Sequence, residues 1–198
     1  MCDYEIEKAL LKKGIENICG VDEVGRGALF GPVVAGAVIL DPNRLNEEIK
    51  DSKKLSHQKR LLLARDIYRT ARAYSIGWCW NDEIDQMNIL QATRVAMKMA
   101  VRRLQINPDY ALIDGMEPDF FDVPGEGIIN GDNRSISIAA ASIIAKVFRD
   151  TLVISFSRFF PAYDFENNKG YPTQKHLNVI SLEGITEFHR KSFKVKGC

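Results

Sequence analysis

Two apolar segments that lie close together near the start of the chain constrain its fold more than any other feature. Residues 17–24 and 32–40 are rich in valine and isoleucine, and only the glycine-containing connection 25–31 separates them. Both segments have the composition of β-strands. Because the connection is too short for a crossover, we expect the two strands to run antiparallel as a hairpin.

The rest of the chain alternates between helical and strand patterns. Helices are predicted over 3–13, 56–73, 88–104, 135–159 and after Thr173, and further strands over 74–80, 109–114 and near 128–129. Because helices separate the later strands, we expect these strands to be parallel. The pattern predicts an α/β fold with a mixed sheet flanked by helices. We expect residues 1–160 to form the main domain and residues 161–198 a small helical extension packed on it.

The composition is typical of a soluble globular protein and argues against several other classes. The 198 residues are 45% hydrophobic with a net charge of +1, so overall charge indicates neither a nucleic-acid nor a membrane partner. The four cysteines form no C-x-x-C pair, which argues against a zinc site or a disulfide framework. The apolar runs are too short to span a bilayer, and the N-terminus has no signal-peptide pattern. We therefore expect a cytoplasmic protein.

Four acidic residues lie where apolar strands end. Asp22 and Glu23 end the first strand, Asp114 ends the strand over 109–114, and Asp132 follows the apolar residues near 128–129. A single Asp at such a place is usually a cap or a turn residue. Four together are costly, because two carboxylates about 4 Å apart repel by roughly 4 kcal/mol at an effective dielectric constant near 20. Such a cluster must hold protons or bind cations, and oxygen ligands favour Mg²⁺ or Mn²⁺ over zinc.

Asp22 and Glu23 are neighbours, and neighbouring side chains in a strand point to opposite faces. If Asp22 points into a site, Glu23 must reach it through a distorted strand end, through the glycine turn or through its backbone carbonyl. Gly25, Gly27 and Gly31 give the turn the conformational freedom that this needs.

The turn and several later motifs, all in the same order, resemble ribonuclease HII. The motifs are GVDEVGRG at 20–27, GPVV at 31–34, DSKKL at 51–55, NILQAT at 88–93, IDG at 113–115, GD at 131–132, SIAAASIIAKV at 137–147, GY at 170–171 and HRKSF at 189–193. The resemblance extends from about residue 18 to residue 193. It implies a ribonuclease H-like mixed sheet and an endonuclease that cuts the RNA strand of RNA–DNA hybrids, including single ribonucleotides within duplex DNA.

The resemblance also implies roles for individual residues. By position in the motifs, the metal-binding acids are Asp22, Glu23, Asp114 and Asp132; the turn that senses the ribose 2′-hydroxyl is Gly25, Arg26 and Gly27; and the tyrosine that packs on the sugar beyond the RNA–DNA junction is Tyr171. Two Mn²⁺ or Mg²⁺ ions would balance four carboxylates, one activating water and the other stabilising the leaving 3′ oxygen, so that 5′-phosphate and 3′-hydroxyl ends result.

Basic residues are candidate phosphate contacts. Lys53 lies in the basic run 50–60, Lys146 lies in the long helix, and a basic tail covers 189–196. Phosphate contacts position a duplex without reading its sequence. The alternative for each lysine is a structural or solvated role.

A few residues near the turn and near Tyr171 differ from the pattern of the family that the chain resembles. Ala28 and Phe30 differ from residues that the family often has, and Pro172 follows Tyr171 and favours an extended backbone that presents the ring outward. The histidines have no metal-pair spacing and are expected at the surface; they are His57, His176 and His189.

Two other classes of function remain open at this stage. A junction resolvase on the same type of sheet would need the acids but no ribose sensor. A non-catalytic protein that binds hybrids would gain nothing from the acids, because they repel phosphate. The favoured interpretation is a monomeric nuclease whose partners are RNA–DNA hybrids and ribonucleotide-containing duplex DNA.

Overall fold

A mixed β-sheet forms the centre of the molecule. The computed structural model describes residues 3–49 and 55–193, and the five strands of its sheet have the order β3-β2-β1-β4-β5. Strand β1 is antiparallel to β2 and parallel to β4, and β4 is parallel to β5, as the sequence predicts. The strands are β1 (Ile18–Val24), β2 (Val33–Ile39), β3 (Ala73–Cys79), β4 (Tyr110–Asp114) and β5 (Gly125–Ile128).

The prediction of a parallel arrangement is wrong for β3, which pairs antiparallel with β2. The connection between them contains a helix, but it leaves and re-enters the sheet at the same end, where Ile39 lies opposite Ala73. At this end the backbone N–H of Arg72 donates to the carbonyl oxygen of Ile39 at 2.9 Å. A helix between two strands gives a parallel pair only when the chain crosses to the other end of the sheet, and here it does not.

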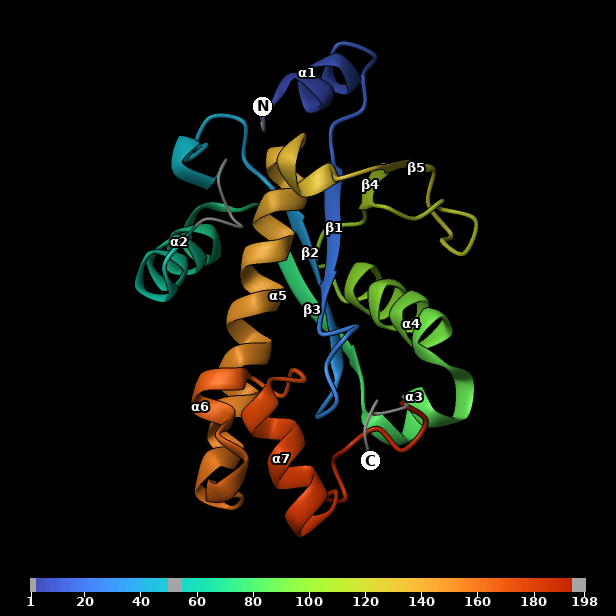
Figure 1. Ribbon diagram of the computed structural model, residues 1–198. Helices are drawn as coiled ribbons and strands as arrows, with labels where there is room; N and C mark the ends of the chain where they lie inside the picture. Colours follow the sequence, from blue (N-terminus) through green and yellow to red (C-terminus); the bar gives the residue numbers. More distant parts are fainter. Residues whose placement is uncertain (1–2, 50–54, 194–198) are drawn as a thin grey trace.

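Helices cover both faces of the sheet (Figure 1). Helix α5 lies along β1 and β2 on one face with α2 beside it, and α4 lies against β2 and β3 on the other. Helices α3 and α6 were not expected from the sequence, because both are short and largely polar. The helices are α1 (Glu5–Leu11), α2 (His57–Thr70), α3 (Asn81–Met87), α4 (Ile89–Arg102), α5 (Ile136–Ser155), α6 (Phe165–Asn168) and α7 (Gln174–Glu183), with short 3-10 turns η2 (Gly131–Asn133), η3 (Phe156–Arg158) and η4 (Pro161–Tyr163).

Helix α5 lies unusually close to the sheet. Glycines on β1 and β2 make room for it, since a Cβ on Gly36 would lie 2.4 Å from the carbonyl oxygen of Ala141. The alanines 139–141 are fully buried, and their small side chains allow the helix to approach the sheet closely. The helix predicted from residue 135 begins there, because Ser135 caps it: its Oγ accepts a hydrogen bond from the N–H of Ile138 at 3.2 Å.

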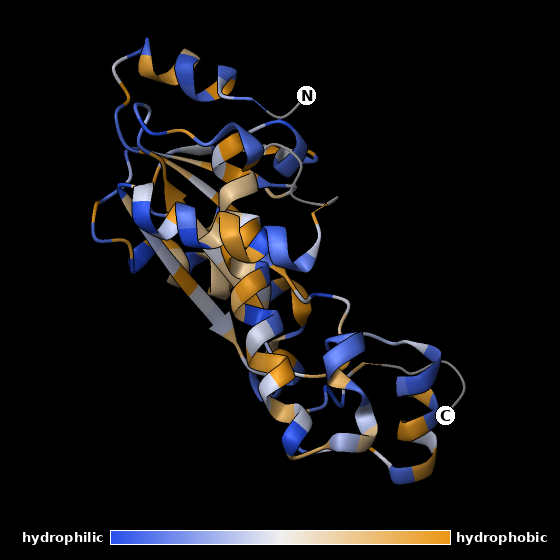
Figure 2. Ribbon diagram, turned by 90° about the vertical axis from the view of Figure 1, so that its left-hand side faces the viewer, coloured by the Kyte–Doolittle hydropathy of each residue, from blue (hydrophilic) through white to orange (hydrophobic). Residues whose placement is uncertain are grey.

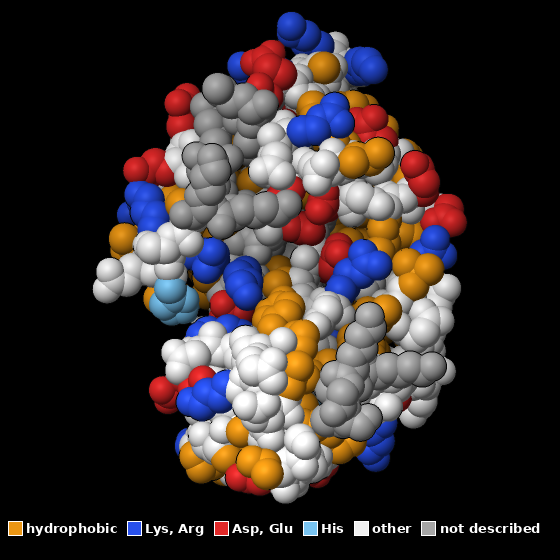
Figure 3. Space-filling model, in the orientation of Figure 1, with side chains coloured by type: hydrophobic (Ala, Val, Ile, Leu, Met, Phe, Trp, Pro, Cys, Tyr) orange, Lys and Arg blue, Asp and Glu red, His pale blue; other side chains and the backbone are white. Residues whose placement is uncertain are grey.

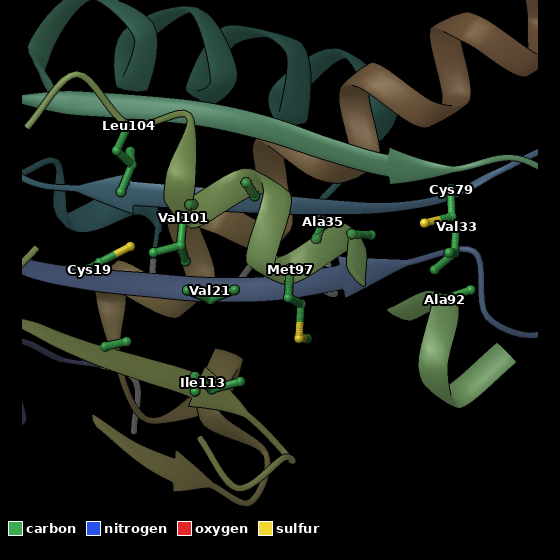
Figure 4. Close-up of a cluster of buried hydrophobic side chains, with 14 of the residues drawn as sticks. Cys19, Val21, Val33, Ala35, Cys79, Ala92, Met97, Val101, Leu104 and Ile113 are labelled. Carbon is green, nitrogen blue, oxygen red and sulfur yellow. The ribbon is translucent and has the colours of Figure 1, made fainter. Parts of the chain in front are cut away.

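The main apolar core lies between the sheet and α4 (Figure 4). Val21 and Ile113 from adjacent strands meet Met97 from the helix, and all three side chains are fully buried. Alternate residues of β1 point to the opposite face, towards α5. The central strands β1 and β2 are therefore covered on both sides.

The C-terminal segments pack on the hairpin turn rather than on the sheet. Leu29 and Phe30 of the turn share an apolar cluster with Tyr163, Phe165 and Ile180. In Figures 1 and 2 these segments lie at the lower end of the molecule, beyond the end of α5. Within the described part of the chain, no helix is both long and apolar enough to cross a membrane.

Candidate active site

Three of the four predicted acids meet at the ends of two neighbouring strands. Val21 of β1 pairs with Ile113 of β4, and Asp22 and Asp114 follow directly in the two strands. Asp22 is only 5% exposed, and burial, followed by the negative charges of Glu23 and Asp114, raises its pKa well above the ordinary range. Burial also raises the pKa of Glu23, and Asp114 adds to this effect. We call Asp22, Glu23 and Asp114 the acid cluster.

Asp22 and Glu23 are neighbours in the sequence, yet both side chains belong to the acid cluster. Both stand at the end of β1, where the strand stops at Val24 and Gly25 adopts a left-handed φ of 91°. The N–H of Glu23 donates to Asp22 Oδ1 at 2.7 Å, and Glu23 Oε1 forms an ion pair with Arg26 Nη1 at 3.3 Å. The other carboxylate oxygen, Glu23 Oε2, is buried and has no hydrogen-bond partner. This oxygen is available to a cation.

Asp132 lies in η2, which contacts the acid cluster through a hydrogen bond. The N–H of its neighbour Gly131 donates to Asp114 Oδ1 at 2.6 Å, which connects η2 directly to the end of β4. Asp132 is 1% exposed, and its Oδ1 accepts from Asn133 Nδ2 at 3.0 Å. The backbone of η2 thus places Asp132 next in the chain to the residue that binds Asp114.

The donor set of this site fits a hard divalent cation. All four candidate ligands are carboxylates, and Glu23 Oε2 is buried without a hydrogen-bond partner. A positive charge would also relieve the burial and repulsion that raise the pKa of Asp22. Among the described residues, no three acids, histidines or cysteines stand close enough to hold an ion as they are.

Ser142 orients Asp22, and sequence reasoning gave it no role. Its side chain on α5 forms a hydrogen bond with the carboxylate of Asp22, which lowers the pKa of this acid and so opposes the effect of burial. The available signal was a single hydroxyl in a helix segment made of alanine and isoleucine. A small polar side chain on a buried helix face needs a partner, and here the partner is an acid of the site.

The Gly25-Arg26-Gly27 turn follows the acid cluster directly. Gly25 has a positive φ, and a Cβ on it would lie 2.1 Å from Arg149 Nε, so only glycine fits this position. Gly27 differs, because it is exposed and no heavy atom would lie within 4 Å of an added Cβ. Arg26 is exposed and paired with Glu23. The turn thus offers an open backbone surface beside the acids.

Two buried arginines hold the turn in place, and the sequence analysis assigned neither of them this role. Arg149 of α5 donates from Nε to the carbonyl of Pro32, from Nη2 to that of Phe30 and from Nη1 to that of Lys169, each at 3.0 Å. The turn and the segment that precedes Tyr171 are therefore joined through one guanidinium group.

The prediction that the basic tail meets phosphates is wrong for Arg190. It is 3% exposed and donates from Nε to the carbonyl of Gly31 at 3.0 Å and from Nη1 to that of Arg26 at 2.9 Å. Burial lowers its pKa to about 9, with the charge of Arg149 as the second cause. Arg190 therefore supports the turn from the protein interior, where no substrate can reach it.

Tyr171 stands beside the turn and is partly exposed. The carbonyl oxygen of Gly170, the residue before it, accepts a hydrogen bond from the N–H of Leu29 at 2.8 Å, so the loop that carries Tyr171 is bound to the turn. Lys146 Nζ and the guanidinium carbon of Arg149 each lie 5.2 Å from the centroid of the tyrosine ring. Lys146 is also paired with Asp150 at 2.8 Å. Contact of Lys146 with a phosphate stays a prediction, and Lys53 lies outside the described residues.

The prediction for the histidines is confirmed for one and wrong for two. His57 is exposed, but His176 and His189 are 0% and 1% exposed. Their burial depends on aromatic rings of the C-terminal cluster, which a single sequence does not place around them.

The face that carries the site is shown in Figure 3, where acidic side chains lie near the middle, Lys and Arg side chains lie beside them, and the C-terminal elements lie below.

Comparisons with known proteins agree with the resemblance found in the sequence. Residues 19–196 match the sequence profile described as ribonuclease HII. A curated ribonuclease HII from Caldicellulosiruptor saccharolyticus is 46% identical over 190 residues, which cover 96% of this chain and 93% of the relative. A chain of the solved PCNA:RNase HII complex from Archaeoglobus fulgidus has a TM-score of 0.77 at 24% identity, over 91% of this chain and 96% of that chain. The structure of Bst-RNase HIII in complex with Mn²⁺ has a TM-score of 0.70 at 20% identity, over 85% of this chain and 63% of that chain.

Proposed function

The chain belongs to the ribonuclease HII family and is a ribonuclease H hydrolase, and on this premise we propose how it selects and cuts its substrate. Membership of the family implies endonucleolytic cleavage of the RNA strand of RNA–DNA hybrids. We propose that the protein also cuts at single ribonucleotides embedded in duplex DNA and leaves 5′-phosphate and 3′-hydroxyl ends.

One observation carries this proposal: an open glycine backbone lies directly beside buried carboxylates. Gly27 is exposed with free space around it, and Arg26 of the same turn is ion-paired with Glu23 at 3.3 Å. Backbone groups without a Cβ can approach one sugar closely, and the 2′-hydroxyl distinguishes RNA from DNA at a single position. A ribose read by Gly25, Arg26 and Gly27 would place its phosphodiester next to the acid cluster.

The acid cluster and Asp132 are proposed to hold Mn²⁺ or Mg²⁺. The oxygen-only donors and the partnerless Glu23 Oε2 support this, as does the Mn²⁺ complex of Bst-RNase HIII, which has a similar fold. Bound divalent ions supply an activated water and a positive charge at the leaving 3′ oxygen. The residues of this chain orient the donors: Ser142 and the N–H of Glu23 fix Asp22, and the N–H of Gly131 fixes Asp114.

Three further residues are proposed to bind the duplex around the cut. The ring of Tyr171 packs on the deoxyribose beyond the RNA–DNA junction, in the position that Lys146 and Arg149 give it. Lys146 and Lys53 contact phosphates and so position the strands without reading their sequence. Lys146 can do this by exchanging its ion pair with Asp150 for one with a phosphate.

The proposal includes the wider organisation of the protein. We take residues 1–160 as the catalytic domain and 161–198 as a helical extension, which has its own apolar cluster around Phe165 and is anchored on Phe30 of the turn. We propose that the protein acts as a monomer in the cytoplasm. In this arrangement the extension carries Tyr171 to the site, and no second subunit is needed to complete it.

A cleavage assay on four substrates separates the proposed activity from a junction resolvase. The substrates are an RNA–DNA hybrid, a DNA duplex with one ribonucleotide, the matching all-DNA duplex and a four-way DNA junction, each with Mn²⁺ or Mg²⁺ and with a chelator. We expect cuts in the first two substrates only, and none with the chelator. Cleavage of the junction, or equal cleavage of the all-DNA duplex, would contradict the proposal.

A further inference from the structure

Two buried histidines touch each other in the C-terminal part of the molecule. His176 of α7 and His189 of the segment after it bring their Nε2 atoms to 3.0 Å, and both side chains are at most 1% exposed. The distance is that of a hydrogen bond, so one ring donates and the other accepts. The outer nitrogens of the two rings decide which ring donates.

The partners at both ends allow only one direction. The backbone N–H of Thr186 lies 2.9 Å from His189 Nδ1, and because an N–H can only donate, this nitrogen carries no hydrogen. The hydroxyl of Thr186, 2.8 Å from the same nitrogen, then also donates to it. A neutral His189 therefore carries its hydrogen on Nε2 and donates it to His176. At the other end, His176 Nδ1 lies 2.9 Å from the carbonyl oxygen of Tyr171, which can only accept, so Nδ1 carries the hydrogen. Each ring is thus neutral, with a defined tautomer.

The surroundings of the pair favour its neutral state. The titratable group that faces both rings is the phenol of Tyr163 from η4, whose hydroxyl donates to the carbonyl of Gly184 at 2.9 Å. Phe165 from α6 packs on both rings, and Phe30 from the hairpin turn packs on His189. Arg190 follows His189 in the chain, and its guanidinium group is directed to the turn carbonyls. In the described part of the chain, no carboxylate is hydrogen-bonded to either ring.

We propose that His189 and His176 are positioning residues that fix the backbone of Tyr171 through a one-way chain of hydrogen bonds from Thr186. The inference rests on the proposed contact of Tyr171 with the sugar. Each ring nitrogen of the chain has a hydrogen-bond partner, so the carbonyl of Tyr171 has one defined location. Because the same ring of His189 packs on Phe30 at a centroid distance of 5.2 Å, the chain also sets the tyrosine relative to the turn.

Protonation breaks this chain, which gives it a pH signature. A proton on His176 would set two N–H groups against each other at the Nε2 contact. A proton on His189 Nδ1 would break its hydrogen bond with the N–H of Thr186 and leave only the Thr186 hydroxyl as an acceptor. Burial lowers the pKa of both histidines, that of His189 to about 4 with the charge of His176 as second cause. The unfolded chain binds these protons near pH 6.5 and the folded chain does not. The stabilisation is therefore present above about pH 6.5 and is lost as the pH falls towards about 4.

Nitrogen-15 NMR of the imidazole rings tests the chain without any substrate. We expect His189 to give the pattern of the Nε2–H tautomer and His176 that of the Nδ1–H tautomer, and both to keep these patterns at pH 6. The exposed His57 supplies the third signal for assignment through a His57→Gln variant. If either buried ring shows the opposite tautomer, or is protonated at pH 6, the inference is wrong.

Two variants of His189 test the effect on cleavage. His189→Gln keeps an amide N–H that can donate to His176, whereas His189→Leu removes the donor. On a duplex with one ribonucleotide we expect His189→Leu to raise KM by about 5- to 50-fold with little change in kcat, because a misplacement of about 1 Å can cost up to ~100-fold. His189→Gln should stay within about threefold of the wild type, as should His57→Gln. Equal KM values for the Leu and Gln variants, measured at the same folded fraction, would overturn the inference.

A double-mutant cycle separates this inference from the proposed role of Tyr171. If His189 acts through Tyr171, then His189→Leu has no further effect on KM in a Tyr171→Ala background. If the two effects simply add, the positioning chain is wrong while the role of Tyr171 stands. If Tyr171→Ala alone leaves KM unchanged, the proposed sugar contact is wrong, and the NMR result still decides whether the chain of hydrogen bonds exists.

Discussion

The acid cluster and the turn over residues 25–31 lie next to each other, and their buried charged groups differ in how well they are compensated. In the acid cluster, burial and mutual repulsion raise the pKa of Asp22 and Glu23, and one buried oxygen of Glu23 has no partner. In the turn, each donor nitrogen group of Arg149 finds a carbonyl at 3.0 Å. The carboxylates of Asp22 and Glu23 are thus only partly compensated, whereas the guanidinium group of Arg149 is fully hydrogen-bonded within the protein. In the proposed function, this difference separates the acids that would bind the cations from the preformed turn that would recognise the sugar.

The largest effect is expected from a change in the acid cluster. Asp114→Asn keeps the shape and the oxygen that accepts the N–H of Gly131 but removes a charge. We expect cleavage to fall by at least ~1000-fold, because a cation ligand is lost. The melting temperature in metal-free buffer should stay equal or rise, because repulsion of Asp22 and Glu23 is relieved.

Mn²⁺ titration adds a second measurement to this variant. Mn²⁺ should raise the melting temperature of the wild type more than that of Asp114→Asn. The exposed Asp122, which is ion-paired with Arg102 at 2.7 Å, provides the control Asp122→Asn, and its activity should be unchanged. An Asp114→Asn protein that cuts at nearly the wild-type rate shows that Asp114 is not part of the site.

The two glycines of the turn form a matched pair that tests how far the turn is built in advance. Gly25→Ala places a Cβ 2.1 Å from Arg149 Nε at a positive φ, so we expect the free energy of unfolding to fall by about 2–4 kcal/mol. Gly27→Ala meets no atom within 4 Å, so its change should stay within about 0.5 kcal/mol. Urea denaturation measures both. Equal losses would show that Arg149 does not restrict the turn.

A smaller effect on cleavage is expected from changes at Tyr171, because the turn that is proposed to bind the ribose stays intact. Tyr171→Phe keeps the ring and should retain most activity, whereas Tyr171→Ala should weaken cleavage at a single ribonucleotide more than it lowers the melting temperature. Kinetics on the one-ribonucleotide duplex, with a thermal melt of each variant, provide the test. A Tyr171→Ala protein that is markedly unstable but cuts normally where folded would assign the ring to packing alone.

The smallest effect concerns the phosphate contacts, which act on neither of the two regions directly. Hybrid binding should weaken as salt rises, and Lys53→Ala should reduce the slope of log K against log salt by about one if Lys53 touches a phosphate. The same salt titration of Lys146→Ala provides a comparison with a lysine that the structure describes. A Lys53→Ala slope equal to that of the wild type would return Lys53 to the solvated surface.

The sequence predicts the acid cluster better than the turn that lies beside it. Asp22 and Asp114 stand at the ends of strands whose pattern is clear, so their meeting follows from strand pairing. Arg149 could not be predicted in its role, because its three acceptors are backbone carbonyls of residues 30, 32 and 169, which only tertiary structure brings together.

The errors have the same origin. Histidines in a polar segment were expected at the surface, but aromatic rings from Phe30, Tyr163 and Phe165 close around His176 and His189. The direction of β3 depended on where its connection re-enters the sheet, which the helical pattern of α2 does not reveal. Local pattern thus predicts which elements form, and the contacts between distant segments decide the rest.

The central claim is that buried carboxylates completed by divalent cations cut a phosphodiester that the preformed turn selects by one 2′-hydroxyl. Its most direct test is the mapping of product ends from a DNA duplex with one ribonucleotide, run beside the same duplex without it, with Mn²⁺ or Mg²⁺. The account predicts a single cut at the ribonucleotide, a 5′-phosphate and a 3′-hydroxyl at the cut, and no product from the all-DNA duplex. Cleavage without divalent cations, a 2′,3′-cyclic phosphate end or cutting of the all-DNA duplex would contradict it.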